Sequence, residues 1–206
     1  MVKSRNVALV APLAGVALGV LDFVWIKYVP SPFGELGNSI AVWAVVAFLL
    51  TFGNRWTLSA GILGGAICLV VAVPSYYLAA TLIQNDNPAN MYNAVALLWM
   101  GLGVVAGTVF GAAGVLARTG DGLVRLAAAA MPGAVLFAEA VMQGRRIGDP
   151  NYETASLVGY IAVLLASGVA VTLLVCRSWR QRGIALLLTL PLTAVGYVLL
   201  LLTGFR

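Results

Sequence analysis

Seven long apolar stretches follow one another almost without interruption along this chain, at residues 7–29, 36–52, 57–83, 92–117, 123–142, 154–175 and 184–203. As helices, stretches of this kind cross the roughly 30 Å of hydrocarbon in a bilayer. Only 9% of the residues are charged and 62% are hydrophobic, too little charge to cover the surface of a soluble protein. We therefore expect an all-α polytopic transmembrane helical bundle, forming a single domain over residues 1–206.

The number of crossings and their direction rest on the second stretch and on the basic residues. Stretch 36–52 is short, and if it enters and leaves on the same side, six full crossings remain and every later orientation reverses. With seven spans, the positive-inside rule places the N-terminus in the cytoplasm. One side then carries Lys3, Arg5, Arg55, Arg118, Arg125, Arg177, Arg180 and Arg182, against Lys27, Arg145, Arg146 and Arg206 on the other. We interpret the run from Arg177 to Arg182 as a topology determinant.

Several classes of chemistry find no support in the residues. The chain contains no histidine, and its two cysteines, Cys68 and Cys176, lie in or at the end of apolar stretches without metal-ligand spacing. There is no phosphate-binding loop and no glycine-flanked nucleophilic serine. We expect no catalytic residue, metal or cofactor, and hence no enzyme. The basic residues sit at span ends, where topology explains them, so nucleic acid is not an expected partner.

Small residues recur every four positions in three of the expected helices. Such rows let helix backbones approach closely in lipid, where hydrophobicity contributes little to association. They predict that the first, third and fourth spans pack tightly against one another. The rows are Ala11, Gly15 and Gly19; Gly61 and Gly65; and Gly103, Gly107 and Gly111.

Extending these rows along their helices brings polar and aromatic side chains to the bundle interior. At about 100° per residue, Asp22 and Tyr76 lie roughly 20° from the lines of their rows, and Trp99 lies roughly 40° away. Under the seven-span topology these residues share the outer half of the membrane with Asn38 and Glu139. We therefore predict an outward-facing ligand-binding pocket lined by Asp22, Asn38, Tyr76, Trp99 and Glu139.

Less specific interpretations remain open for the same residues. Lys27 would draw Asp22 toward the interface, and Glu139 would sit at the headgroup level near Arg145 and Arg146. The segment from Pro30 to Ser39 is either a tight external connection or a lid over the pocket. Trp56 and Trp179 are expected in the aromatic belt of the opposite side, outside any site.

Three functions are compatible with these features. The leading hypothesis is an integral membrane protein that binds a small molecule, as a transporter or transporter subunit of the bacterial plasma membrane. The alternative is a non-catalytic structural or assembly partner of a larger membrane complex or homo-oligomer, with the glycine rows exposed to a partner helix. The third, an enzyme acting on a lipid through Glu139, has the least support. All three share the lipid bilayer as a partner.

Several runs carry a resemblance to a known family. ELGNSIAVWAVVAFLLTFG with Asn38, Ser39 and Trp43, the fourth-span run ALLWMGLGVVAGTVFGAAG, and FAEAV with Glu139 look like an uncharacterised family of small actinobacterial integral membrane proteins. The resemblance implies a multi-spanning fold and no particular activity. A looser analogy is to the substrate-binding components of energy-coupling-factor transporters, which are helical bundles of similar length with an outward pocket, although they usually have six spans.

Overall fold

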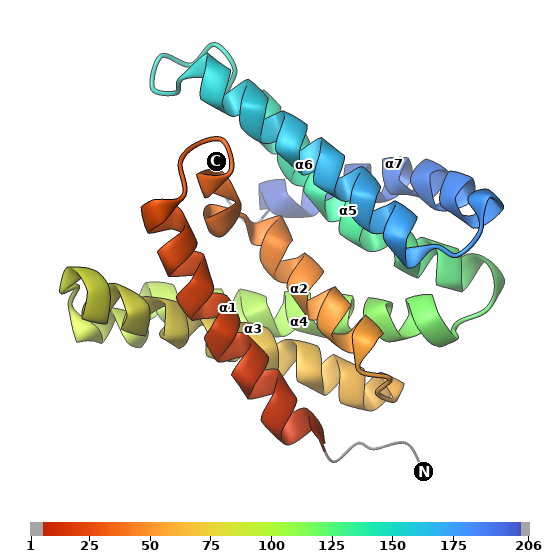
Figure 1. Cartoon of the computed structure of the whole chain (residues 1–206), viewed down its shortest axis with the longest axis horizontal. Coiled ribbons are helices and arrows are strands. Elements are labelled where there is room, and N and C mark those ends of the chain that lie inside the picture. The colour runs from red at the N-terminus through yellow and green to blue at the C-terminus, as the bar shows by residue number, and fades with distance from the viewer. Residues whose placement is uncertain (1–5, 203–206) are drawn as a thin grey trace.

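The computed structural model describes residues 6–202, and these residues form seven α-helices and two short 3₁₀-helices (Figure 1). No strand occurs in this part of the chain, which confirms the all-α prediction. In chain order the elements are α1 (Val7–Tyr28), η2 (Gly34–Asn38), α2 (Ile40–Gly53), α3 (Leu58–Gln84), η3 (Pro88–Met91), α4 (Ala94–Thr119), α5 (Gly122–Gly144), α6 (Thr154–Val175) and α7 (Trp179–Leu202).

Helices α1, α3 and α4 form a tightly packed group, as the small-residue rows predict. A Cβ on Gly19 would collide with the backbone of α3 at Ala72, and Cβ atoms on Gly65 and Gly107 would each collide with the other's carbonyl oxygen. The contacts run in the same order along α1 and α3 and in opposite order along α3 and α4. Helices α1 and α3 are therefore parallel, and α4 is antiparallel to both.

This packing corrects one part of the assembly hypothesis. The glycine rows of α3 and α4 face each other, and the α1 row faces α3, so their close-approach surfaces are filled within the chain itself. Helices that already touch backbone to backbone leave no groove for another helix at that position. A partner helix would have to dock elsewhere.

Helix α2 is the central and shortest of the seven. Its 14 residues extend only about 21 Å at 1.5 Å per residue. Ala47, Phe48 and Thr51 have no exposed surface, as expected of an apolar helix buried in a core rather than facing lipid. In Figure 1 α2 lies between α1 and α5. Because α1 and α3 are parallel, the segment that contains η2 and α2 returns the chain to the side on which α1 begins.

The segment before α2 folds back along α1 instead of staying outside. After the turn that follows α1, η2 brings Gly37 against the backbone of Ile26 and Asp22, two and six residues before the end of α1. The side chain of Ser39 then caps α2 by accepting a hydrogen bond of 3.1 Å from the Val42 N–H. Residues 34–38 are thus a short 3₁₀-helix packed on α1, not only an external turn.

Helices α5, α6 and α7 form the second group. Gly133 of α5 and Gly168 of α6 allow close contact between these helices, and α7 also packs against α5, with Thr189 near Gly133. The two groups meet where α5 contacts α2 and α4. A core of mostly small side chains around Phe48 fills this junction near the start of α5; its other members are Ala113, Ala117, Ala128, Ala129, Ala130, Val175, Cys176 and Ala185.

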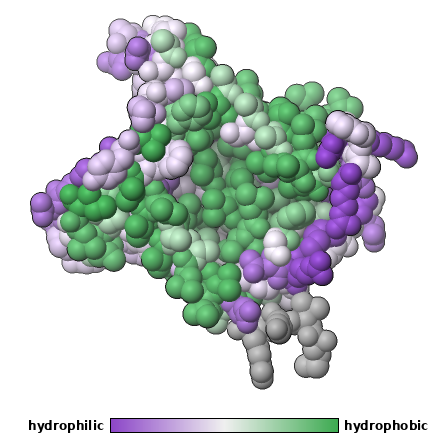
Figure 2. Space-filling model, viewed as in Figure 1, coloured by the Kyte–Doolittle hydropathy of each residue, from purple (hydrophilic) through white to green (hydrophobic). Residues whose placement is uncertain are grey.

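Within residues 6–202, six helices are long and apolar enough to cross a membrane, namely all except α2. Figure 2 agrees with this arrangement, since hydrophobic atoms cover the middle of the visible face and hydrophilic atoms gather at its ends. Helix α7 begins at Trp179, earlier than the predicted Ile184, because Ser178 starts the helix by accepting a bond from the Gln181 N–H. The predicted end of that span, Thr203, lies outside the described residues.

Candidate functional site

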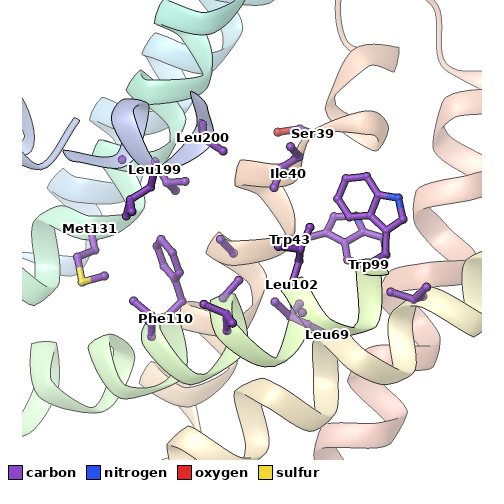
Figure 3. A pocket seen from close by; sticks show the side chains of 18 of the residues that line it. Ser39, Ile40, Trp43, Leu69, Trp99, Leu102, Phe110, Met131, Leu199 and Leu200 are labelled. Carbon is purple, nitrogen blue, oxygen red and sulfur yellow. The ribbon is translucent and has the colours of Figure 1, made fainter. Parts of the chain in front are cut away.

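A cavity of about 570 Å³ lies between the two helix groups (Figure 3). Helices α1, α2, α3 and α4 contribute one part of its wall, and α5 and α7 contribute the other. Most of the wall is apolar, including Leu69, Leu102, Phe110, Met131 and Leu199. The volume is in the range of sites that bind small molecules.

One end of the cavity is polar and aromatic. Asp22, Asn38, Tyr76 and Trp99, four of the five residues predicted for a pocket, all line this cavity. Asp22 is six residues from the end of α1 and Trp99 five from the start of α4, so both lie about 8–9 Å inside their helix ends. Small-residue packing explains this convergence: it fixes which faces of α1, α3 and α4 point inward.

Asp22 is buried but has few partners. It is 8% exposed, and the Trp43 side chain is its hydrogen-bond partner. Within residues 6–202, no lysine or arginine forms an ion pair with it; the nearby Lys27 ammonium instead donates to the Ile83 carbonyl at 3.3 Å. A carboxyl group in this setting keeps acceptor capacity directed at the cavity.

Aromatic rings surround this carboxyl group. Tyr76 lies near Asp22, and its ring packs edge-on against Phe23 and Tyr77 at centroid distances of 5.5 Å. Figure 3 places Trp43 and Trp99 together at one side of the cavity, away from Met131. Aromatic faces near a carboxylate attract cationic groups.

The cavity opens sideways between α4 and α7. Its lining includes Val105 and Val109 of α4 and Val195 and Leu199 of α7, which are all 45–62% exposed. Within the described residues, helices α4 and α7 are not packed against each other, so we infer that these exposed lining residues mark the mouth of the cavity. These four positions belong to membrane-crossing helices, so the mouth lies on the lipid-facing surface.

Glu139 lies elsewhere, and this corrects its predicted place in the pocket. Its carboxylate is 2% exposed and does not line the cavity. One oxygen accepts bonds from the Ser39 hydroxyl at 2.8 Å and from the Ala41 N–H at 2.9 Å, and the other accepts from the Tyr160 hydroxyl at 2.5 Å. Helix α5 turns this residue toward the start of α2 and toward α6, away from the space shared with α7.

The Glu139 contacts satisfy a helix end at membrane depth. The first N–H groups of a helix have no partner within the helix, and its N-terminus carries a partial positive charge. Ser39 and Ala41 at the start of α2 are each 1% exposed, so these groups need a partner within the protein. Glu139 supplies the acceptor, and its carboxyl group is buried among α2, α5 and α6.

The other end of α2 is held by an arginine. Arg118 of α4 donates to the carbonyl oxygens of Thr51 at 3.3 Å, Phe52 at 3.1 Å and Trp56 at 2.8 Å. A cation at a helix C-terminus pairs with the unsatisfied carbonyl groups and with the negative end of the dipole. The sequence analysis assigned Arg118 only to topology.

Together, the long apolar helices and the laterally open cavity define a multi-pass α-helical membrane protein. The chain belongs to the family of unknown function DUF6518, whose family model matches residues 2–204. This result confirms the expectation of an uncharacterised family, while the actinobacterial origin and the energy-coupling-factor analogy stay predictions. No curated protein and no solved structure matches the chain.

Proposed function

We propose that this protein binds a small amphipathic molecule in the cavity between its two helix groups, as a transporter or a transporter subunit. The observation that carries the proposal is the shape and chemistry of that cavity: apolar along most of its wall, polar and aromatic at the Asp22 end, and open toward lipid between α4 and α7. A molecule with an apolar body would enter from the bilayer and place its head beside Asp22.

The chemistry of the polar end favours a cationic head. A carboxyl group and aromatic faces attract a positive charge, and within the described residues no basic side chain competes for Asp22. A protein that only stabilises other subunits would not require a buried carboxyl group facing an open cavity, because such a group is costly in a membrane.

For the orientation, we propose that η2 and α2 together form the seventh crossing and that the N-terminus is cytoplasmic. The parallel arrangement of α1 and α3 supports a return crossing between them. The excess of basic residues on the side where α1 begins supports its assignment to the cytoplasm. The polar end of the cavity would then lie in the outer half of a bacterial plasma membrane.

Binding of probe amphiphiles tests the ligand proposal. We would measure the binding of three probes with the same twelve-carbon chain and a trimethylammonium, hydroxyl or sulfate head to the full-length protein in nanodiscs. We expect preference for the trimethylammonium probe, and at least a ten-fold loss of its affinity in Asp22→Asn. Equal binding of all three heads, or unchanged affinity in this variant, would contradict the proposal.

A matched pair of substitutions tests the lateral mouth. Val105 and Leu98 are both on α4 and are 62% and 63% exposed, but only Val105 lines the cavity. Val105→Trp should weaken probe binding because it narrows the mouth, whereas Leu98→Trp should leave binding unchanged. If both variants bind as the unaltered protein does, the molecule does not enter between α4 and α7.

The exposed faces of α4 and α7 at this mouth also favour the second candidate function, an assembly partner. A helix of another membrane protein could lie across the mouth and close the cavity. Native mass spectrometry after gentle extraction separates the two functions. A bound small molecule that is seen with the unaltered protein and is lost in Asp22→Asn supports the ligand function. Protein that carries no small molecule but stays bound to another polypeptide supports the assembly function.

A further inference from the structure

A second pocket, of about 480 Å³, lies on the side of the bundle where α1 begins. It is formed where α2 ends, α3 begins, α4 ends and α6 connects to α7. Three arginines from three separate segments face it, and no acidic residue lines it. The lining is Arg55, Trp56, Thr57, Arg118, Thr119 and Arg177.

One of the arginines is fixed in place by the fold. The three bonds that Arg118 donates to backbone carbonyls set the position of its guanidinium group. A guanidinium has five N–H donors, so part of this group stays available on the pocket side. Its position does not depend on a ligand, which makes the pocket preorganised.

The other two arginines lack compensating charges. Arg55 and Arg177 are exposed, and within residues 6–202 neither side chain forms an ion pair. The charges of Arg55 and Arg118 repel each other. Asp121, the nearest acidic residue along the chain from Thr119, is exposed and does not line the pocket. Positive groups gathered around a cavity favour an anion inside it.

The start of α3 adds to this preference. The Thr57 side chain accepts a bond of 3.4 Å from the Ala60 N–H, while the Leu58 and Ser59 N–H groups of the first turn have no intrahelical partner. A helix N-terminus with free N–H groups attracts anions. The residue between Arg55 and Thr57 is also unexpected: Trp56 is 3% exposed and packs on Gly64, so it is part of the pocket wall and not of an aromatic belt.

We propose that this pocket binds a phosphate group. Arginine forks match phosphate oxygens, and basic pockets between transmembrane helices bind the headgroups of anionic lipids. The pocket lies at the ends of membrane-crossing helices, where headgroups are located, so an anionic phospholipid is the favoured source of the phosphate. The arginines at positions 55 and 177 thus have a role beyond setting topology.

The test compares Arg177→Gln with Arg180→Gln in the full-length protein. Both residues are exposed and only three positions apart, Arg177 in the connection before α7 and Arg180 in the first turn of α7, but only Arg177 lines the pocket. Thermal unfolding in detergent would be followed while phosphatidylglycerol, phosphatidylcholine or inorganic phosphate is added. We expect phosphatidylglycerol to raise the unfolding temperature of the original protein more than phosphatidylcholine does. This difference should fall at least by half in Arg177→Gln and in Arg55→Gln, and persist in Arg180→Gln.

The outcomes separate a built site from diffuse attraction. If Arg177→Gln and Arg180→Gln reduce the stabilisation by phosphatidylglycerol equally, the proposal is overturned, because any positive charge on that side of the protein would then attract the lipid. No stabilisation by either phosphatidylglycerol or inorganic phosphate would also overturn it. If inorganic phosphate at matched ionic strength reproduces the whole effect, with the same dependence on Arg177, the site binds phosphate but its source is a free anion. Arg118 is left unchanged throughout, since its loss would expose the end of α2.

Discussion

Asp22 and Glu139 are both carboxyl groups buried in the same half of the bundle, yet their surroundings differ. Glu139 accepts three hydrogen bonds from Ser39, Ala41 and Tyr160 and lies outside the cavity. Asp22 has the Trp43 side chain as its hydrogen-bond partner and faces the cavity. The comparison teaches that burial alone does not identify a binding residue. The number of internal partners separates a carboxyl group that stabilises the fold from one that remains available to a ligand.

The largest expected effect is that of Glu139→Ala. This change leaves the Ser39 hydroxyl and the Ala41 N–H without their acceptor, and each unsatisfied buried donor costs about 1–3 kcal/mol. We expect the free energy of unfolding to fall by about 3 kcal/mol or more. Denaturant unfolding in micelles measures it, with Asp22→Ala as the matched control. Equal destabilisation by the two changes would remove the distinction between the two carboxyl groups.

An intermediate effect is expected for Glu139→Gln. The amide keeps one acceptor oxygen for Ser39 and Ala41, while its NH₂ group would face Tyr160, whose hydroxyl can accept as well as donate. The loss of the charged bonds should cost about 1–2 kcal/mol. The same unfolding measurement checks this value, and a loss as large as that of Glu139→Ala would mean that negative charge, rather than hydrogen bonding, holds the start of α2.

A smaller effect is expected for Tyr160→Phe. It removes a single hydrogen bond from Glu139 and leaves the ring in its core of Ala41, Leu136 and Leu164. The free energy of unfolding should fall by about 1 kcal/mol, and by up to about 2 kcal/mol if the bond carries the full strength of a charged acceptor. Unchanged stability would show that the Ser39 and Ala41 bonds suffice.

The smallest effect on stability is expected for Asp22→Asn. The amide has nearly the same shape, and its oxygen still accepts a bond from Trp43, so the free energy of unfolding should change by less than about 1 kcal/mol. The same variant is expected to lose probe binding. A loss of stability as large as that of Glu139→Ala would place Asp22 among the structural residues and contradict the comparison.

The sequence predicts how far a side chain lies along its helix better than it predicts which neighbouring helix that side chain faces. Helix geometry fixes how far each residue lies from a helix end, so Asp22, Tyr76 and Trp99 could be assigned to one level. The glycine rows also predicted which faces of α1, α3 and α4 point into the bundle. Asp22, Tyr76 and Trp99 lie near those faces, and they do line one cavity. Helix α5 has no comparable row on the side of Glu139, so the sequence could not predict which neighbouring helix Glu139 faces.

The contact between Ser39 and Glu139 joins residues 100 positions apart, and no local pattern encodes it. One signal was present: a serine followed by an apolar run indicates a helix start, and two glycines just before it indicate backbone approach to a neighbour. Together they predict a helix that begins inside the bundle. Such a start needs an acceptor from another helix, and Glu139 and Tyr160 were the polar groups at the same level.

Helix α2 is pinned at both ends by side chains from other helices, Glu139 at its start and Arg118 at its end. The opposite wall of the cavity belongs partly to α7, the least buried of the six long helices, which contains Pro191. A change in cavity volume therefore costs least if α7 swings while α2 stays still. The cavity would then have a fixed side formed by α2 and a mobile side formed by α7, and movement of α7 would open it toward the lipid.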